Sequence, residues 1–88
     1  MSKREYLNRV ASIGCVLCRY LELGETPAEI HHVENVRDEL SDYAVVALCP
    51  EHHRGATGVH GLSRRGFVAR YKLTDVDLLA ITARELVR

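Results

Sequence analysis

The chain has 88 residues, of which 47% are hydrophobic and 27% are charged. This composition excludes a disordered chain, and the longest apolar runs, such as 44–48, are too short to span a membrane. The length predicts one small domain whose apolar core is barely large enough to stabilise the folded state, so a structural metal is expected to contribute to its stability. The first residues lead into charged sequence without an apolar signal-peptide core, so we expect a cytoplasmic protein.

Twelve basic and twelve acidic residues give a formal net charge of zero. Such a balance disfavours strong nucleic-acid binding unless the charges are segregated along the chain. No acidic residue occurs from Arg54 to Thr74, whereas acidic residues cluster from Glu22 to Asp42. The basic residues of the acid-free segment are Arg54, Arg64, Arg65, Arg70 and Lys72. They form either a phosphate-contacting surface or an ordinary solvated face.

The first half of the chain predicts two helical segments and a strand. A helix is expected over residues 2–12, and Gly14 ends it. Its apolar face consists of Tyr6, Leu7, Val10 and Ile13. A helical turn is predicted over 19–23, a short strand over 28–33 and a polar loop over 34–42.

The segment 44–48 is rich in β-branched residues and predicts the second strand of a hairpin. Pro50 suits the first turn of a helix, so a short helix is expected to display His52 and His53.

Two further helices are predicted towards the end of the chain. One covers residues 63–71, and the last begins at Thr74, with Asp77 as its capping partner. The apolar face of the last helix is predicted to contain Val76, Leu79, Ala83 and Leu86.

All three cysteines fall into two ligand pairs, Cys15-x-x-Cys18 and Cys49-x-x-His52. A tetrahedral zinc ion needs four such ligands, and a two-residue spacing lets one tight turn present two of them. An odd number of cysteines in a cytosolic chain also argues against a disulfide framework. Two alternatives stay open: the cysteines are small buried hydrophobes, or His53 replaces His52 as the fourth ligand.

Three of the five histidines predict a second centre. His31 and His32 are adjacent, so on a strand their side chains point to opposite faces. One of them could bind a metal while its neighbour faces another atom of the same substrate, and His53 would complete the site. Hydrolysis of a phosphodiester requires a metal-bound phosphate oxygen and an imidazole that activates water. His31 could instead be an ordinary hydrogen-bonded strand residue.

The sequences 30–33 (Ile-His-His-Val) and 48–54 (Leu-Cys-Pro-Glu-His-His-Arg) resemble the ββα-metal, or HNH, nuclease motif. In that family the motif lies in a treble-clef zinc scaffold, and the match covers residues 15–61. The resemblance implies an α+β, zinc-stapled treble-clef domain over 1–88, with a β-hairpin and flanking N- and C-terminal helices. The sequence 58–61 (Gly-Val-His-Gly), followed by an Arg-rich helix, further resembles small prophage-encoded nucleases, including the RecA-dependent group.

The resemblance assigns a role to each matched histidine. His31 matches the first-strand ligand of the catalytic metal, His32 the general base, and His53 the metal ligand on the helix. Cys49 and His52 match the second zinc knuckle. His60 has no counterpart in the shortest form of the motif, and is a third metal ligand, a contact to the scissile phosphate or a simple loop residue. The implied cofactors are a structural Zn²⁺ and a catalytic Mg²⁺ or other divalent ion.

The chain departs from the family at the asparagine that orients the general base. Asn35 lies too close to His32 along the chain to take that place, and Asp42 or Ser41 is better positioned.

The function expected is that of a metal-dependent endonuclease acting on nucleic acid, with DNA favoured. A recombination or phage protein is its expected partner. The alternative is a non-catalytic treble-clef module that binds nucleic acid or protein. Such a module needs only His52, whereas an enzyme also uses His31, His32 and His53.

Overall fold

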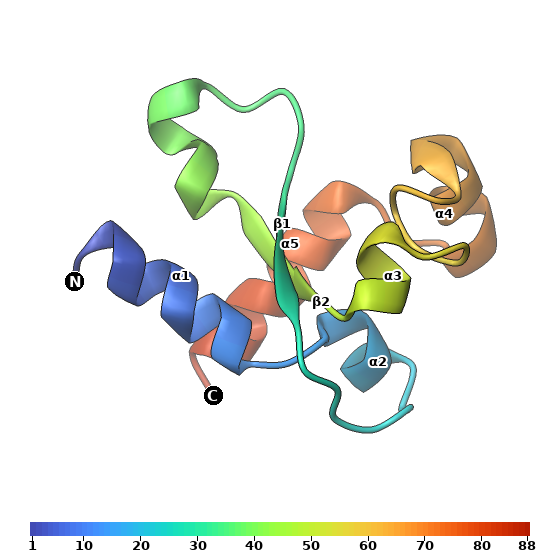
Figure 1. Ribbon diagram of the computed structural model, residues 1–88, viewed down its shortest axis with the longest axis horizontal. Helices are drawn as coiled ribbons and strands as arrows, with labels where there is room; N and C mark the ends of the chain where they lie inside the picture. Colours follow the sequence, from blue (N-terminus) through green and yellow to red (C-terminus); the bar gives the residue numbers. More distant parts are fainter.

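The computed structural model describes residues 1–88 and has a two-stranded hairpin at its centre, with helices around it (Figure 1). The elements in chain order are α1 (Lys3–Ser12), α2 (Val16–Tyr20), β1 (Glu29–His32), η1 (Asp38–Tyr43), β2 (Val45–Leu48), α3 (Pro50–Arg54), α4 (Ser63–Tyr71) and α5 (Asp75–Leu86). The expected α+β class is therefore confirmed. None of the helices has both the length and the apolar character that crossing a membrane requires.

The hairpin is antiparallel, with Glu29 opposite Leu48 and His32 opposite Val45. All four residues of β2 are buried, because α1, α2 and α5 pack against this strand. In β1 the side chains alternate as a pleated strand requires: His31 is 5% exposed, whereas the His32 side chain is 49% exposed. The hairpin thus presents two adjacent histidines to different surroundings.

The first helix forms as expected. Ser2 caps α1 and exchanges hydrogen bonds with Glu5 in a capping box. Val10 is fully buried, and Tyr6, Leu7 and Ile13 pack against the core.

The helical turn predicted over 19–23 lies earlier, as α2 at Val16–Tyr20. Cys15 is the N-cap residue of α2, because its sulfur accepts a hydrogen bond from the Cys18 amide. The loop predicted over 34–42 is also only partly correct, since its second half belongs to the 3-10 helix η1. The ring centroids of Tyr43 in η1 and Tyr6 in α1 are 5.6 Å apart, so these two side chains pack η1 against α1.

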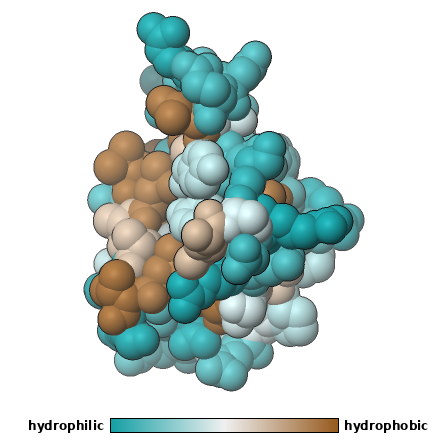
Figure 2. All heavy atoms as spheres, turned by 90° about the vertical axis from the view of Figure 1, so that its left-hand side faces the viewer, coloured by the Kyte–Doolittle hydropathy of each residue, from teal (hydrophilic) through white to brown (hydrophobic).

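The surface over α1 and η1 combines a group of apolar side chains with a larger hydrophilic area (Figure 2). Leu40 and Tyr43, both in η1, are about half exposed, at 52% and 51%. The packing of η1 therefore leaves apolar side chains partly in solvent.

The expected apolar face of α5 is only partly correct, because Leu79 and Leu86 pack against the core but Val76 and Ala83 do not. Val76 is 71% exposed and Ala83 also faces solvent, whereas Leu78, Ile81 and Thr82 are buried. The buried face of α5 could not be recognised from its hydrophobic pattern, because it contains two polar residues. The Thr82 hydroxyl donates a hydrogen bond to the Leu78 carbonyl, and the Glu85 side chain, only 7% exposed, pairs with Arg19. Thr82 satisfies its hydroxyl within the helix and Glu85 satisfies its carboxylate through Arg19 of α2, so a face that contains them can still be buried.

Because Leu78 is buried and Val76 is exposed, substitutions at these two positions of α5 should change the free energy of unfolding by very different amounts. Leu78→Ala removes a fully buried side chain and should lower the free energy of unfolding by about 2–5 kcal/mol. Val76→Ala changes an exposed side chain and should change it by no more than about 0.5 kcal/mol. Urea unfolding of both variants measures the difference, and equal losses would contradict the orientation of α5.

Candidate metal centres

Cys15, Cys18, Cys49 and His52 converge in the core, and all four are buried. The His52 Nδ1 atom lies 3.6 Å from the Cys15 sulfur, 3.5 Å from that of Cys18 and 3.4 Å from that of Cys49. The sulfurs of Cys18 and Cys49 are 3.9 Å apart. The two sequence pairs therefore form one cluster, with Nδ1 of His52 facing the sulfurs.

The cluster has the dimensions of a tetrahedral zinc site. Zinc binds sulfur at about 2.3 Å and imidazole nitrogen at about 2.0–2.1 Å, so tetrahedral ligands lie about 3.6 Å (S to N) and about 3.8 Å (S to S) apart. The distances in the cluster agree with both values. Burial raises the pKa of the Cys15 thiol to about 12, so a thiolate here needs a nearby positive charge. These residues could hold a zinc ion.

Local backbone structure explains why each pair can converge. Cys15 and Cys49 are the N-cap residues of α2 and α3, and their sulfurs accept amide hydrogen bonds from Cys18 and His52. Pro50 follows at the first turn of α3, where its missing N–H is not needed. Each helix start is therefore a knuckle that presents two ligands.

Gly14 is required before the first knuckle. Its φ of +84° is unfavourable for other residues, and a Cβ there would lie 3.0 Å from the Thr26 carbonyl oxygen. The same oxygen accepts a hydrogen bond of 2.9 Å from the Cys15 amide.

His31, His53 and His60 form a second group, called here the histidine trio. Their ring centroids lie 5.2 Å apart for His31–His53 and His31–His60 and 4.8 Å apart for His53–His60. One nitrogen from each residue lies within 4.8 Å of the others. The trio joins β1, α3 and the loop after α3, and its geometry allows a metal ion to be held by three imidazoles.

The loop after α3 delivers His60 to the trio by folding back on the helix. The amides of Val59 and His60 donate hydrogen bonds to the carbonyls of His52 and His53, at 2.9 and 3.0 Å. Gly58 permits this close approach, because a Cβ there would collide with the backbone of α3. The structure therefore brings His60, which the shortest motif lacks, next to both other histidines.

His31 is suited to metal binding by its surroundings. Burial first, and then the neighbouring His53 and His60, lower its pKa to about 4, so the ring is neutral at pH 7. Its Nδ1 is buried and has no hydrogen-bond partner. Because buried polar atoms are normally satisfied, an unpartnered nitrogen beside two other imidazoles fits a role in metal coordination.

Glu29 orients His53, and the sequence analysis did not identify it. His53 Nδ1 lies 2.7 Å from Glu29 Oε1, and Arg54 bonds both carboxylate oxygens at 2.7 and 3.2 Å. The hydrogen bond of Arg54 and then that of His53 lower the pKa of Glu29 to about 2, so Glu29 is ionised and accepts a hydrogen bond from the Nδ1–H group of His53. Nε2 of His53 is then the nitrogen with a free lone pair. The available signal was position: Glu29 and His31 share one face of a strand.

His32 lies on the opposite face of β1, outside the trio. Its Nε2 is 2.8 Å from Asp42 Oδ1, and the other Asp42 oxygen is 3.3 Å from Lys3 Nζ. The His32 hydrogen bond and then that of Lys3 lower the pKa of Asp42. Of the two expected substitutes for the family asparagine, Asp42 contacts His32, whereas Ser41 bonds the Asp38 carbonyl.

The basic residues have different environments. Arg54 pairs with Glu29, Arg64 Nε lies 3.7 Å from Asp75, and Arg70 lies over the Tyr71 ring. Arg65 and Lys72 have no ion-pair partner, and the three arginines of α4 are exposed. Arg54 is therefore partly neutralised, whereas α4 keeps an exposed positive surface.

The fold and the two clusters define a small α+β domain with two candidate metal centres. Comparison with known families gives its relationship: residues 1–86 match the model described as "Recombination enhancement, RecA-dependent nuclease". The chain belongs to this family. No curated protein and no solved structure matches it.

Zinc removal tests the first cluster. Binding at such a site contributes directly to folding, so stripping the metal should abolish the cooperative thermal transition, and adding Zn²⁺ back should restore it. Calorimetry with metal analysis of the same samples makes the measurement. A transition that persists after verified metal removal would contradict a structural zinc at this cluster.

Proposed function

We propose that the chain is a metal-dependent endonuclease of the HNH type, with a treble-clef zinc scaffold, that hydrolyses phosphodiester bonds in nucleic acid. The observation that supports this most is the pairing of two unlike histidine environments on one strand. His31 joins a trio with free ligand nitrogens, and His32 is held by a carboxylate on the other face. Membership in a family named for a nuclease supports the same conclusion.

In this proposal His31, His53 and His60 hold the catalytic divalent ion. The fit rests on the neutral ring of His31 and on the Glu29 hydrogen bond that leaves Nε2 of His53 free. Carboxylate–histidine pairs of this kind commonly orient metal ligands. Mg²⁺ is the ion that the HNH resemblance implies, although three imidazoles also suit Mn²⁺, Ni²⁺ or Zn²⁺. The bound ion would supply positive charge beside the phosphate oxygens.

His32 is the proposed general base. Asp42 is ionised and only accepts hydrogen bonds, so His32 Nε2 carries the proton and Nδ1 keeps its lone pair. Nδ1 can then take a proton from the attacking water. Lys3 pairs with the second oxygen of Asp42 and so holds the carboxylate in place. The carboxylate in turn orients the His32 ring. Asp42 thus takes over the orienting role of the family asparagine.

The proposed zinc gives the reaction site its rigidity. His52 binds zinc while the next residue, His53, belongs to the trio, so α3 connects the two centres directly. A mispositioned α3 would separate His53 from His31, and such displacements reduce catalysis strongly.

DNA is the proposed substrate, and the exposed arginines of α4 are the proposed phosphate contacts. Arg64, Arg65 and Arg70 can bind phosphates without identifying bases, which suits a nuclease of low sequence specificity. Arg54 and Arg64 contribute less than Arg65 and Arg70, because Glu29 and Asp75 already neutralise part of their charges. The family name suggests a nuclease that acts with a recombination protein, and a prophage-type role is proposed from the sequence resemblance alone.

The alternative function is a non-catalytic zinc module that binds nucleic acid or protein. The zinc cluster fits both functions, because it uses only His52 among the histidines. The trio and the His32–Asp42 pair favour the enzyme, since a module has no need of either.

Substitution of His32 separates the enzyme from the module. His32→Ala should reduce plasmid cleavage by about 10²–10⁴-fold, because it removes the general base and leaves both metal centres intact. DNA binding and zinc content should stay at the parent values. His53→Ala is the matched comparison: it should instead weaken the dependence of cleavage on added Mn²⁺ or Mg²⁺.

The assay is nicking of supercoiled plasmid across several divalent ions, with binding measured in parallel. Equal cleavage by the parent and by His32→Ala would remove the proposed mechanism. A parent that cuts neither DNA nor RNA with Mg²⁺, Mn²⁺ or Ni²⁺, even beside its recombination partner, would favour the module.

A further inference from the structure

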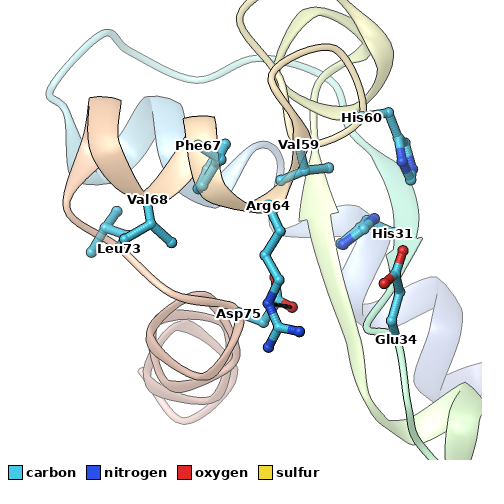
Figure 3. Close-up of a pocket in the computed structure, with 9 residues that line it drawn as sticks. All are labelled: His31, Glu34, Val59, His60, Arg64, Phe67, Val68, Leu73 and Asp75. Carbon is cyan, nitrogen blue, oxygen red and sulfur yellow. Dashed lines mark ion pairs between the residues drawn. The ribbon is translucent and has the colours of Figure 1, made fainter.

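A pocket opens directly beside the histidine trio, between β1, the loop after α3, α4 and the start of α5 (Figure 3). His31 and His60 line one side of it, so the pocket and the trio share two residues. In Figure 3 the ring of His31 lies towards the pocket interior and His60 lies at its edge. Whatever enters the pocket therefore lies next to the proposed catalytic ion.

The far wall of the pocket is apolar. It consists of Val59 from the loop, Phe67 and Val68 from α4, and Leu73. The interior volume is about 40 Å³, which is room for about three water molecules at ~10–15 Å³ each. A whole aromatic ring does not fit in this space, so only one edge of a ring could enter through the open mouth while the rest of the ring stays outside.

The charges around the pocket disfavour a phosphate as its occupant. Glu34 and Asp75 place two carboxylates at the rim, and Arg64 is already directed to Asp75, with its Nε 3.7 Å from the carboxylate. Carboxylates only accept hydrogen bonds, so they select groups with N–H donors. An apolar wall with acceptors at its edge suits a flat ring that has apolar faces and an amino group.

We propose that this pocket receives the amino-bearing edge of an unpaired nucleobase of the strand being cut, adjacent to the scissile phosphate. The inference rests on the proposed nuclease function and names its substrate class. A base in a duplex is stacked and paired, and cannot enter a pocket. The preferred substrate is therefore single-stranded DNA or a duplex opened at the cleavage position. A base with an exocyclic amino group, such as cytosine, matches the carboxylates best.

Binding experiments test the pocket without requiring cleavage. The zinc-loaded protein, without other divalent ions, is titrated into a labelled single-stranded DNA and into a fully abasic strand of equal length. Contact of a base with apolar and aromatic side chains predicts about 5- to 150-fold tighter binding of the strand that has bases. Equal binding of the two strands by the parent protein would overturn the proposal.

Two substitutions in α4 localise the effect. Val68→Phe fills the pocket and should bring the affinity ratio of the two strands close to one. Ala69→Phe adds the same ring at the next, exposed position of α4 and should keep the parent ratio. Val59→Phe fills the pocket from the loop and replaces Val68→Phe if that variant loses its zinc or its thermal transition. If a folded variant with a filled pocket keeps the parent's affinity ratio for the two strands, the proposal is overturned.

Cleavage then distinguishes this inference from the function on which it rests. With Mn²⁺, the parent should cut a duplex beside a single unpaired cytosine faster than the fully paired duplex, and Val68→Phe should lose this preference. Equal rates on the two duplexes would overturn the pocket assignment while the nuclease function stands. A base-dependent binding ratio with no cleavage of any substrate would overturn the nuclease function and support a base-binding pocket.

Discussion

The convergence of three sulfurs and one imidazole nitrogen in the core is the interaction on which the rest of the structure depends. It draws the start of α2 to the junction of β2 and α3, although Cys18 and Cys49 are 31 residues apart in the sequence. A chain of 88 residues has a small apolar core, so a zinc ion bound by these four ligands would contribute a large share of what holds the segments together. Burial raises the pKa of the Cys15 thiol to about 12, so Cys15 can be a thiolate ligand only if a cation lies beside its sulfur.

The position of α3 carries this constraint from the zinc cluster to the histidine trio. His52 and His53 are adjacent, and a helix turns about 100° per residue, so their side chains point in different directions. His52 points to the sulfurs, whereas His53 points to His31 and is held by Glu29. The loop after α3 bonds the same two residues through their carbonyls and thereby places His60. One short helix therefore fixes ligands for both centres, and the apolar pocket lies against the second of them.

Local spacing predicted the parts of the structure that depend on neighbours in the sequence. The two knuckles, the hairpin, α3 and the opposite orientation of His31 and His32 follow from two-residue spacing, Pro50 and strand alternation. Contacts that join distant segments could not be predicted in this way. Glu29 meets Arg54 and His53 only after the hairpin and α3 have packed, and Arg19 makes Glu85 acceptable on a buried face of α5. The pocket likewise requires β1, α4 and α5 together, so no single motif indicates it.

The most direct test of two centres joined by α3 is the number and ligand type of bound metals in one sample. The account predicts one tightly held Zn²⁺ whose X-ray absorption spectrum fits three sulfurs and one nitrogen. It also predicts one exchangeable site at which Mn²⁺, added to the zinc-loaded protein, shows histidine nitrogen couplings by pulsed electron paramagnetic resonance. A His31→Ala, His60→Ala double variant should lose the nitrogen-coupled Mn²⁺ and keep the zinc. A single class of metal site, or Mn²⁺ without nitrogen ligands, would contradict the account.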